Sequence, residues 1–405
     1  MNTKKLPLKE KIGYLISLPP FLWIFSGQLT TNHAYKALVG LISISLVISC
    51  CYYGPKAILS NLTSNRWLQI LALMLLSAIL FQEYNNGSST GMLRAYACML
   101  VLFISIPTFE SRRIFSKLHW YLLLSSIVLL TSSFLHAHIW HTPRALWPIN
   151  AITFTTISAV VAACSLIYAL LSSSKRVRSV GLLSFTLSLN SILIGQTRGV
   201  ILALVVAAAI IIILTYRKKQ LLVNRLAIVG VLSIFSIILN SSSIIGRINS
   251  TKNEITHLKQ AQYTTSIGIR LQLWSSSIYP ITDNPLLGIG DQHQEYRQKL
   301  FEQKLLKKEF IAWDHYHNQY VDKLVRNGLI GLMLFLLLVT YPLTQLQRLD
   351  FLPRLIVIGT ISVCATAALT DVPLTHVQPF IIFVSLISLC LAQGTNTGRP
   401  CESSS

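Results

Sequence analysis

The sequence predicts an all-α integral membrane protein that crosses a bilayer about twelve times. The chain has 405 residues, of which 52% are hydrophobic and only 12% are charged. A soluble domain of this size cannot bury that much apolar surface. The apolar residues also come in continuous runs of helix length, not in the alternating segments of a transmembrane β-barrel. Both observations favour a polytopic helical fold.

Each predicted span is an apolar run bounded by polar residues, and one of them is irregular. The first run contains Pro19 and Pro20, which interrupt the hydrogen bonds of a helix. It follows a basic N-terminus without a small-residue cleavage site, so we interpret it as an uncleaved first helix. The predicted spans lie near residues 12–26, 37–53, 67–82, 92–107, 119–136, 149–171, 180–195, 200–216, 226–243, 328–342, 355–370 and 379–392.

Lysine and arginine are distributed unevenly between alternate loops, and this predicts the orientation. If the N-terminus is cytoplasmic, the inner loops carry most of the basic residues and the short outer loops carry few. The asymmetry predicts that both termini are cytoplasmic. The inner-loop residues are Lys56, Arg66, Arg112, Arg113, Lys117, Lys175, Arg176, Arg178, Arg217, Lys218, Lys219, Arg225, Arg348 and Arg354, and the outer-loop residues are Lys36, Arg94, Arg144 and Arg198.

The chain therefore divides into four parts. Residues 1–243 form nine predicted transmembrane helices, 244–327 a long outer loop, 328–392 three further helices, and 393–405 a disordered cytoplasmic tail. The outer loop has apolar residues at helical spacing between Tyr296 and Leu305, which predicts amphipathic helix lying along the membrane interface.

The net charge of +20 is explained by this basic inner surface and gives no reason to expect a nucleic-acid partner. The seven cysteines lie in apolar runs or in the tail, where they are typical of small core residues and not of a disulfide framework.

Candidate functional residues gather at the predicted outer face. Arg198 lies in a tight turn between two apolar runs, and Arg94 lies just inside the fourth span. An arginine at such a place is costly unless it is paired or functional. A snorkelling or salt-bridged arginine is the structural alternative. The functional one is anion binding, since a planar guanidinium suits phosphate.

Arg270 has Trp274 four residues later, so both share one helix face. A cation–π contact or a simple surface arginine is the structural alternative here. The stretch 284–290, Asn-Pro-Leu-Leu-Gly-Ile-Gly, is rich in turn residues, and its glycines would let the backbone approach a ligand closely.

Histidine and aspartate supply the other polar groups at this face. Asp314, His315 and His317 precede a short amphipathic segment, and Asp371 begins the last outer loop. Histidine exchanges protons near neutral pH, and an acid beside it can orient it or pair with an arginine. Two histidines two residues apart lack a clear third ligand, so no metal site is predicted. Taken together, several arginines and a histidine pair with few acids predict a metal-free site for a diphosphate.

In this order and spacing the motifs resemble the O-antigen ligase family, within a superfamily that includes O-antigen polymerases and protein O-oligosaccharyltransferases. The resemblance covers nearly the whole chain as topology, with one long loop before the last three spans. In sequence it rests on Arg198-Gly199, Arg270 to Trp274, Asn284 to Gly290, His317-Asn318 with Gly328 to Gly331, and Asp371.

The resemblance implies an inner-membrane glycosyltransferase with its active site facing the periplasm. Such an enzyme would transfer an undecaprenyl-diphosphate-linked O-antigen glycan to a hydroxyl of lipid A–core, inverting the anomeric carbon and completing lipopolysaccharide. No cofactor, metal or nucleotide is expected. Arg198 and Arg270, helped by Arg94, would bind the diphosphate. His317 would be the base or acceptor-positioning residue, with His315 beside it and Asp371 orienting or charge-balancing the site.

Three other functions remain open from the sequence. An O-antigen polymerase would use the same donor with another glycan as acceptor, and a protein oligosaccharyltransferase often carries a larger C-terminal region. A transporter of lipid-linked sugars would also use arginines, but it predicts charged or broken helices at the middle of the membrane.

Overall fold

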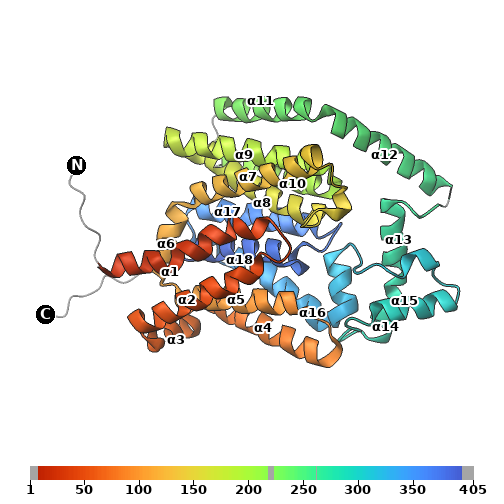
Figure 1. Ribbon diagram of the computed structural model, residues 1–405, viewed down its shortest axis with the longest axis horizontal. Coiled ribbons are helices and arrows are strands. Elements are labelled where there is room, and N and C mark those ends of the chain that lie inside the picture. The colour runs from red at the N-terminus through yellow and green to blue at the C-terminus, as the bar shows by residue number, and fades with distance from the viewer. Residues whose placement is uncertain (1–7, 218–222, 261, 395–405) are drawn as a thin grey trace.

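The computed structural model describes residues 8–217, 223–260 and 262–394, and in these ranges the fold is entirely helical, with no strand. This confirms the all-α prediction (Figure 1). Most of the predicted tail, from residue 395 on, lies outside the described residues, as do two inner-loop lysines, Lys218 and Lys219.

The described residues form eighteen α-helices, together with short 3-10 and π-helical turns, and every predicted span overlaps one of the α-helices. They are α1 (Leu8–Ile24), α2 (Tyr35–Tyr53), α3 (Pro55–Ser64), α4 (Arg66–Asn85), α5 (Thr90–Ser105), α6 (Thr108–Ser116), α7 (Leu118–Phe134), α8 (Ala151–Leu171), α9 (Lys175–Gly195), α10 (Arg198–Arg217), α11 (Val223–Leu239), α12 (Ser241–Lys259), α13 (Ser266–Ser276), α14 (Ile278–Asp283), α15 (His293–Glu302), α16 (Gln319–Thr344), α17 (Phe351–Ala367) and α18 (Val377–Leu391).

Not all of these helices are long enough to span a membrane alone. By length and composition eight described helices qualify, or up to ten if the bent pairs α5–α6 and α11–α12 each form one span. Helices α17 and α18 are apolar but shorter, with 17 and 15 residues. The fold is that of a polytopic membrane protein, and the count of twelve spans stays a prediction.

The core of the bundle is formed by α8, with α17 and α18 beside it. Of the apolar window of α8, 94% is buried, so this helix is surrounded by protein on all sides. Its small residues let α9 approach closely, and two serine pairs bridge the helices: Ser158 Oγ lies 3.1 Å from Ser191 Oγ, and Ser165 Oγ lies 2.7 Å from Ser184 Oγ. Small residues and buried hydroxyl pairs are typical of helix packing in membranes.

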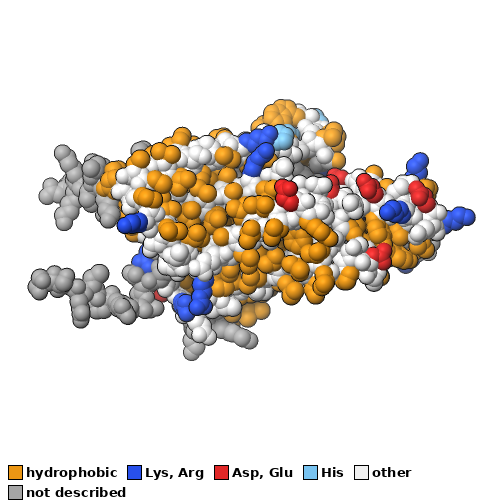
Figure 2. All heavy atoms as spheres, turned by 90° about the horizontal axis from the view of Figure 1, so that it is seen from below, with side chains coloured by type: hydrophobic (Ala, Val, Ile, Leu, Met, Phe, Trp, Pro, Cys, Tyr) orange, Lys and Arg blue, Asp and Glu red, His pale blue; other side chains and the backbone are white. Residues whose placement is uncertain are grey.

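The two ends of the bundle differ in character. At one end, the start of α1 packs on α6 at Gly13, and Arg112 of α6 donates to the carbonyl of Ala392, just after α18. Helices α13, α14 and α15 lie at the other end (Figure 1). Figure 2 shows a face of the bundle dominated by hydrophobic side chains, with a mixture of acidic and basic side chains at the α13–α15 end. The two described ends of the chain therefore share one end of the bundle, and the cytoplasmic location of this end stays a prediction.

The helix predicted between Tyr296 and Leu305 is present as α15 (His293–Glu302), and its location along a membrane interface stays a prediction. It packs in a small separate core that includes Leu273 of α13, Phe310 and Tyr316. This second core gives a fixed shape to the region of α13–α15, here called the outer region after its predicted location. The region can therefore hold its side chains in defined positions against the bundle.

The glycines of the stretch 284–290 serve the fold, which corrects the expectation that they approach a ligand. Gly288 and Gly290 have φ angles of 67° and 60°. A Cβ on Gly290 would lie 1.9 Å from the carbonyl oxygen of Asn85, and one on Gly288 would lie 2.5 Å from that of Val325. The close approach is therefore to the backbones of α4 and α16.

Helix α16 breaks where this stretch meets it. Gly328 has φ 62° and ψ −163°, outside the helical region. The amide of Leu329 donates to the carbonyl of Pro285, at 2.8 Å, in place of a helical partner. The break therefore joins the region of α13–α15 to the span, and it separates the polar first turns of α16 from its apolar part at Gly328.

Candidate functional site

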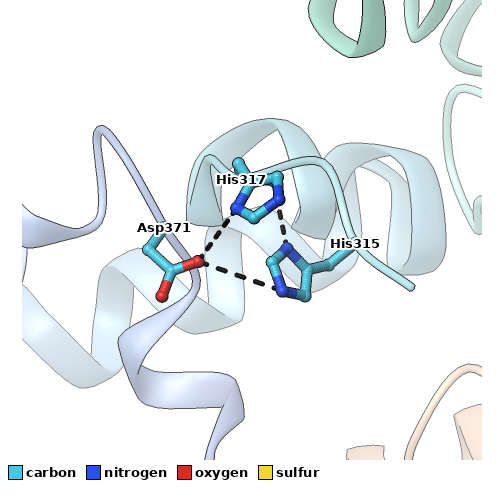
Figure 3. Close-up of side chains that lie close together, drawn as sticks. All are labelled: His315, His317 and Asp371. Atoms are coloured by element: carbon cyan, nitrogen blue, oxygen red, sulfur yellow. Dashed lines mark hydrogen bonds and ion pairs between the residues drawn. The ribbon is translucent and has the colours of Figure 1, made fainter. Parts of the chain in front are cut away.

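The centre of the site is a carboxylate flanked by two imidazoles (Figure 3). Asp371 Oδ1 lies 3.3 Å from His317 Nδ1 and 3.9 Å from His315 Nε2. Asp371 is 3% exposed. The two histidines come from the loop before α16 and the aspartate from the loop after α17, so 54 residues separate His317 from its partner. The structure thus brings together all three residues predicted as catalytic.

Protonation states follow from these contacts. Burial alone raises the pKa of Asp371, but the hydrogen bond to His317 and the nearby imidazoles hold that pKa below its usual value. An ionised carboxylate only accepts, so His317 must donate from Nδ1. In neutral His317 the Nε2 atom then carries the free lone pair. This is the arrangement of a histidine prepared to accept a proton.

His315 is in a different state. Its Nδ1 accepts the backbone N–H of His317 at 3.3 Å, so its proton is on Nε2, toward Asp371. Burial lowers the pKa of His315 to about 4, although the charge of Asp371 opposes this. His315 is therefore neutral at neutral pH and supports the backbone of His317.

The loop that carries the histidines is held from both sides. The indole N–H of Trp274 donates to the carbonyl of Tyr316 at 2.8 Å, and the amide of Tyr316 donates to the buried carboxylate of Asp322 at 3.3 Å. His317 itself has a φ of 48°. A non-glycine residue in this left-handed region is uncommon and often marks a constrained functional position. Asn318 then caps α16 by accepting from two amides of its first turn.

The loop that carries Asp371 is fixed by one buried glutamine, Gln319. Its Oε1 accepts the amide of Leu374 at 2.9 Å, and its Nε2 donates to Thr375 Oγ1 at 2.5 Å. Its own amide donates to the carbonyl of Ala368 at 2.8 Å. Because Gln319 lies two residues after His317, it sets the distance between the imidazole and the carboxylate.

Beside this centre lies a cavity of about 740 Å³ lined by arginines. Arg198, at the start of α10, and Arg270, on α13, both line it. Their predicted role in binding a diphosphate stays a prediction. His317 lines the same cavity, whereas its neighbours His315 and Asp371 do not. Of the three residues predicted as catalytic, His317 is the one that reaches the cavity.

The two predicted arginines are held in different ways. Arg198 donates from one terminal nitrogen, Nη2, to both carboxylate oxygens of Glu254 on α12, at 3.0 and 2.9 Å, and from the other, Nη1, to Thr251. Arg270 donates to the carbonyl of Thr370 at 3.1 Å and to Ser266. Its charge therefore has only neutral hydrogen-bond partners there. The contact with Thr370 joins α13 to the residue before Asp371.

Arg94 is placed differently from the other two. It lies in the first turns of α5, is exposed, and is not among the residues that line the cavity. Its role in diphosphate binding stays a prediction without support from the cavity.

Sequence reasoning missed several residues of the site. Arg144 was counted only as an outer-loop charge, and Arg247, Glu254 and Gln319 were not singled out. Arg144 and Arg247 also line the cavity. No local pattern distinguishes these residues, because the contacts that matter join helices far apart in the sequence.

A metal site was not predicted because a third ligand was missing, and this premise was wrong. Ligand atoms of His315, His317 and Asp371 all lie within 4.8 Å of one another, the one such group within the described residues. Three ligands are enough for an open zinc site. The same atoms are already paired as imidazole and carboxylate, and the adjacent arginines supply positive charge where a metal would. Metal independence stays a prediction.

The fold and the site together define a class: a multi-pass membrane protein with an arginine-lined cavity and a His–Asp pair at one end of its helical bundle. Residues 183–336 match the family model described as O-antigen ligase. This segment contains Arg198, Arg270, His315 and His317, while Asp371 lies beyond it. This segment of the chain is therefore similar to the O-antigen ligase family.

A curated relative adds a second, partial match. A protein of Haemophilus influenzae, described only as uncharacterized, is 27% identical over 144 residues. The matched part is 35% of this chain and 36% of the relative, so the chain spans about a third of that protein's length. This likeness carries no information on activity.

Proposed function

We propose that the protein is an O-antigen ligase, which transfers an undecaprenyl-diphosphate-linked O-antigen glycan to a hydroxyl of lipid A–core. The observation that carries the proposal is the shared cavity: arginines suited to a diphosphate leaving group line the same space as His317, whose imidazole is hydrogen-bonded to the buried carboxylate of Asp371. The match of residues 183–336 to the O-antigen ligase family model supports this class of reaction.

The donor binds with its diphosphate against Arg270 and Arg198. Arg270 lies next to Thr370 and so near the carboxylate of Asp371, whose charge opposes the lowering of the Arg270 pKa by burial. Fixed guanidinium groups stabilise the negative charge that develops on the leaving diphosphate, and their positions need no reorganisation during the reaction.

The acceptor hydroxyl is activated by His317. Its oxygen attacks the anomeric carbon on the face opposite the diphosphate, and the new C–O bond forms as the bond to the diphosphate oxygen breaks. The hydroxyl proton passes to Nε2 of His317, while Asp371 stabilises the resulting imidazolium through Nδ1. Undecaprenyl diphosphate leaves, and the anomeric configuration is inverted.

No step in this scheme uses a metal, a nucleotide or another cofactor. Electrostatic stabilisation and proton transfer come from the chain's own residues, the arginines and His317. In the proposed setting the protein is a multi-pass protein of the bacterial inner membrane, with both termini cytoplasmic and the cavity open to the periplasm, where the donor glycan and lipid A–core meet.

The test is a transfer assay with the purified full-length protein, lipid-linked glycan and lipid A–core, in the presence of EDTA and without nucleotide. A glycan ladder on lipid A–core supports the ligase. Longer lipid-linked glycan with unmodified lipid A–core identifies a polymerase instead. Neither product, with the donor merely moved across a vesicle membrane, identifies a transporter and refutes the proposal.

Two variants place the chemistry in the cavity. Arg270→Ala is expected to lower transfer by about a hundredfold or more, in line with the loss of a charge-stabilising group. Arg66→Ala, which removes an exposed arginine at the opposite end of the bundle, is the matched control and is expected to retain activity. Equal losses in both variants would contradict a site in this cavity.

A further inference from the structure

The cavity holds more positive charge than its two predicted ligands explain. Arg144 comes from the short 3-10 helix Arg144–Leu146 between α7 and α8, and Arg247 comes from α12. Both line the same space as Arg198 and Arg270. Four arginines from four separate elements therefore converge on one cavity, which is not expected of arginines that merely face a membrane surface.

The charge of this cluster is only partly balanced. Glu254 pairs with Arg198, and the carboxylate of Asp371 lies behind His317 near Arg270. Four guanidinium groups thus face two carboxylates, which leaves an excess of two positive charges. A lipid-linked diphosphate carries one negative charge on each phosphate, so its charge equals this excess.

Arg144 and Arg247 also have hydrogen-bonding capacity to spare. The Nε atoms of both are buried and lack a hydrogen-bond partner within the described residues. The Nη2 atom of Arg144 donates to a neutral hydroxyl, Thr197 Oγ1, at 3.1 Å. A buried unpaired donor is costly unless a ligand completes it.

The surroundings of Arg144 point the same way. Burial, together with the charges of Arg247 and Arg198, lowers the pKa of Arg144 to about 10. The residue is still charged at neutral pH, but it is poorly solvated and close to two like charges. An anion bound between these residues would offset both the poor solvation of Arg144 and its repulsion from the neighbouring guanidinium groups.

Arg198 cannot bind the anion in this cavity alone. Its two terminal nitrogens are already used by Glu254 and Thr251. Carboxylate and phosphate compete for the same planar fork. The donors that are free for a second phosphate therefore belong to Arg144 and Arg247.

Resting on the proposed function, we propose that Arg144 and Arg247 bind the second phosphate of the lipid-linked donor, so that the cavity selects a diphosphate over a monophosphate. Arg270 holds the phosphate that is attached to the sugar in this arrangement, and Arg198 joins it by exchanging a carboxylate oxygen of Glu254 for a phosphate oxygen. Arg144 and Arg247 hold the phosphate attached to the lipid. The pair is a specificity determinant and takes no part in proton transfer.

The test compares the binding of farnesyl diphosphate and farnesyl monophosphate to the full-length protein in nanodiscs. For the unaltered protein we expect the diphosphate to bind at least about tenfold more tightly. Arg144→Gln and Arg247→Gln should each weaken diphosphate binding by about tenfold and change monophosphate binding by less than about threefold. Arg66→Gln at the opposite end of the bundle is the charge-matched control.

Two further variants keep the result interpretable. Arg144→Lys and Arg247→Lys retain the charge without the planar fork and should restore part of the diphosphate preference, which a mere folding defect would not allow. A preference unchanged by the glutamine variants, or equal losses for both ligands, would overturn the inference and leave the proposed donor class intact. No binding of either ligand to the unaltered protein would overturn both.

Discussion

At the scale of single residues, the site depends on how two loops are held together. The hydrogen bond between His317 and Asp371 exists because Gln319 ties the Asp371 loop to the first turn of α16. The sequence revealed the histidines and the aspartate because they are rare polar groups beside apolar runs. It did not reveal Gln319, whose importance comes from contacts more than fifty residues away.

Replacing Gln319 with leucine tests this dependence. The substitution leaves the buried amide of Leu374 without its acceptor, and we expect a loss of about 1–3 kcal/mol in the free energy of unfolding. The rate of glycan transfer should fall by more than the loss of folded protein explains, because Asp371 is then free to move away from His317. The measurement pairs thermal unfolding in detergent with transfer rates.

Gln345→Leu is the control, since this residue lies at the other end of α16. Unaltered transfer in Gln319→Leu would show that the glutamine does not position Asp371.

The lowered pKa of His315 predicts a pH dependence of stability. The pKa is about 4 in the folded protein and about 6.5 in an unfolded chain. Between these values the unfolded state binds the additional proton, so stability falls as the pH drops from about 7 to 4. His315→Gln should reduce the fall in unfolding temperature between pH 7 and pH 5.

The fall should not vanish, because the pKa values of His293 and His376 are lowered as well. An identical pH profile in His315→Gln and the unaltered protein would contradict a neutral, buried His315.

At the scale of elements, the outer region is joined to the bundle by glycines. The stretch 284–290 was correctly recognised as a turn, but a turn alone does not reveal what it contacts. The positive φ angles of Gly288 and Gly290 and the break at Gly328 fit one another as backbone against backbone. The sequence shows glycine at each place, and only the packed structure shows that the partner is protein and not ligand.

Gly290→Ala should disturb this junction strongly. The added Cβ would lie 1.9 Å from the carbonyl oxygen of Asn85, on a backbone with a φ of 60°. We expect a destabilisation of about 1–3 kcal/mol, measured by chemical or thermal unfolding. Gly246→Ala is a matched control, since no atom lies within 4 Å of its Cβ position and it lies on a helix. Equal stability of the two variants would refute the tight junction.

At the scale of the whole molecule, helix length and apolar composition predicted the fold well. Each predicted span contains a helix, because an apolar run of that length has few other stable states in a bilayer. The convergence of arginines on one cavity was only half predicted. In the sequence, Arg198 and Arg270 are distinguished by their apolar or aromatic neighbours. Arg144 and Arg247 have no such distinguishing neighbours and resemble ordinary surface charges of a loop and a helix. Their meaning depends on tertiary packing.

The asymmetry of the basic loops predicts the orientation of the bundle in the membrane. We expect a fluorescent protein fused at the C-terminus to fold in the cytoplasm and to fluoresce, and a phosphatase fused after Lys259 to be active in the periplasm. The reverse pattern would place the arginine cavity on the cytoplasmic side and would contradict the proposed meeting place of donor and acceptor.

The most direct test of the account is the single-turnover rate of glycan transfer in His317→Ala, measured with EDTA present and with donor affinity recorded in parallel. The account predicts a rate lowered by about 10²–10⁴ at nearly unchanged donor affinity, because His317 takes the acceptor proton while the arginines hold the donor. A near-normal rate in His317→Ala, beside complete loss in Arg270→Ala, would contradict it and leave catalysis to the arginines alone.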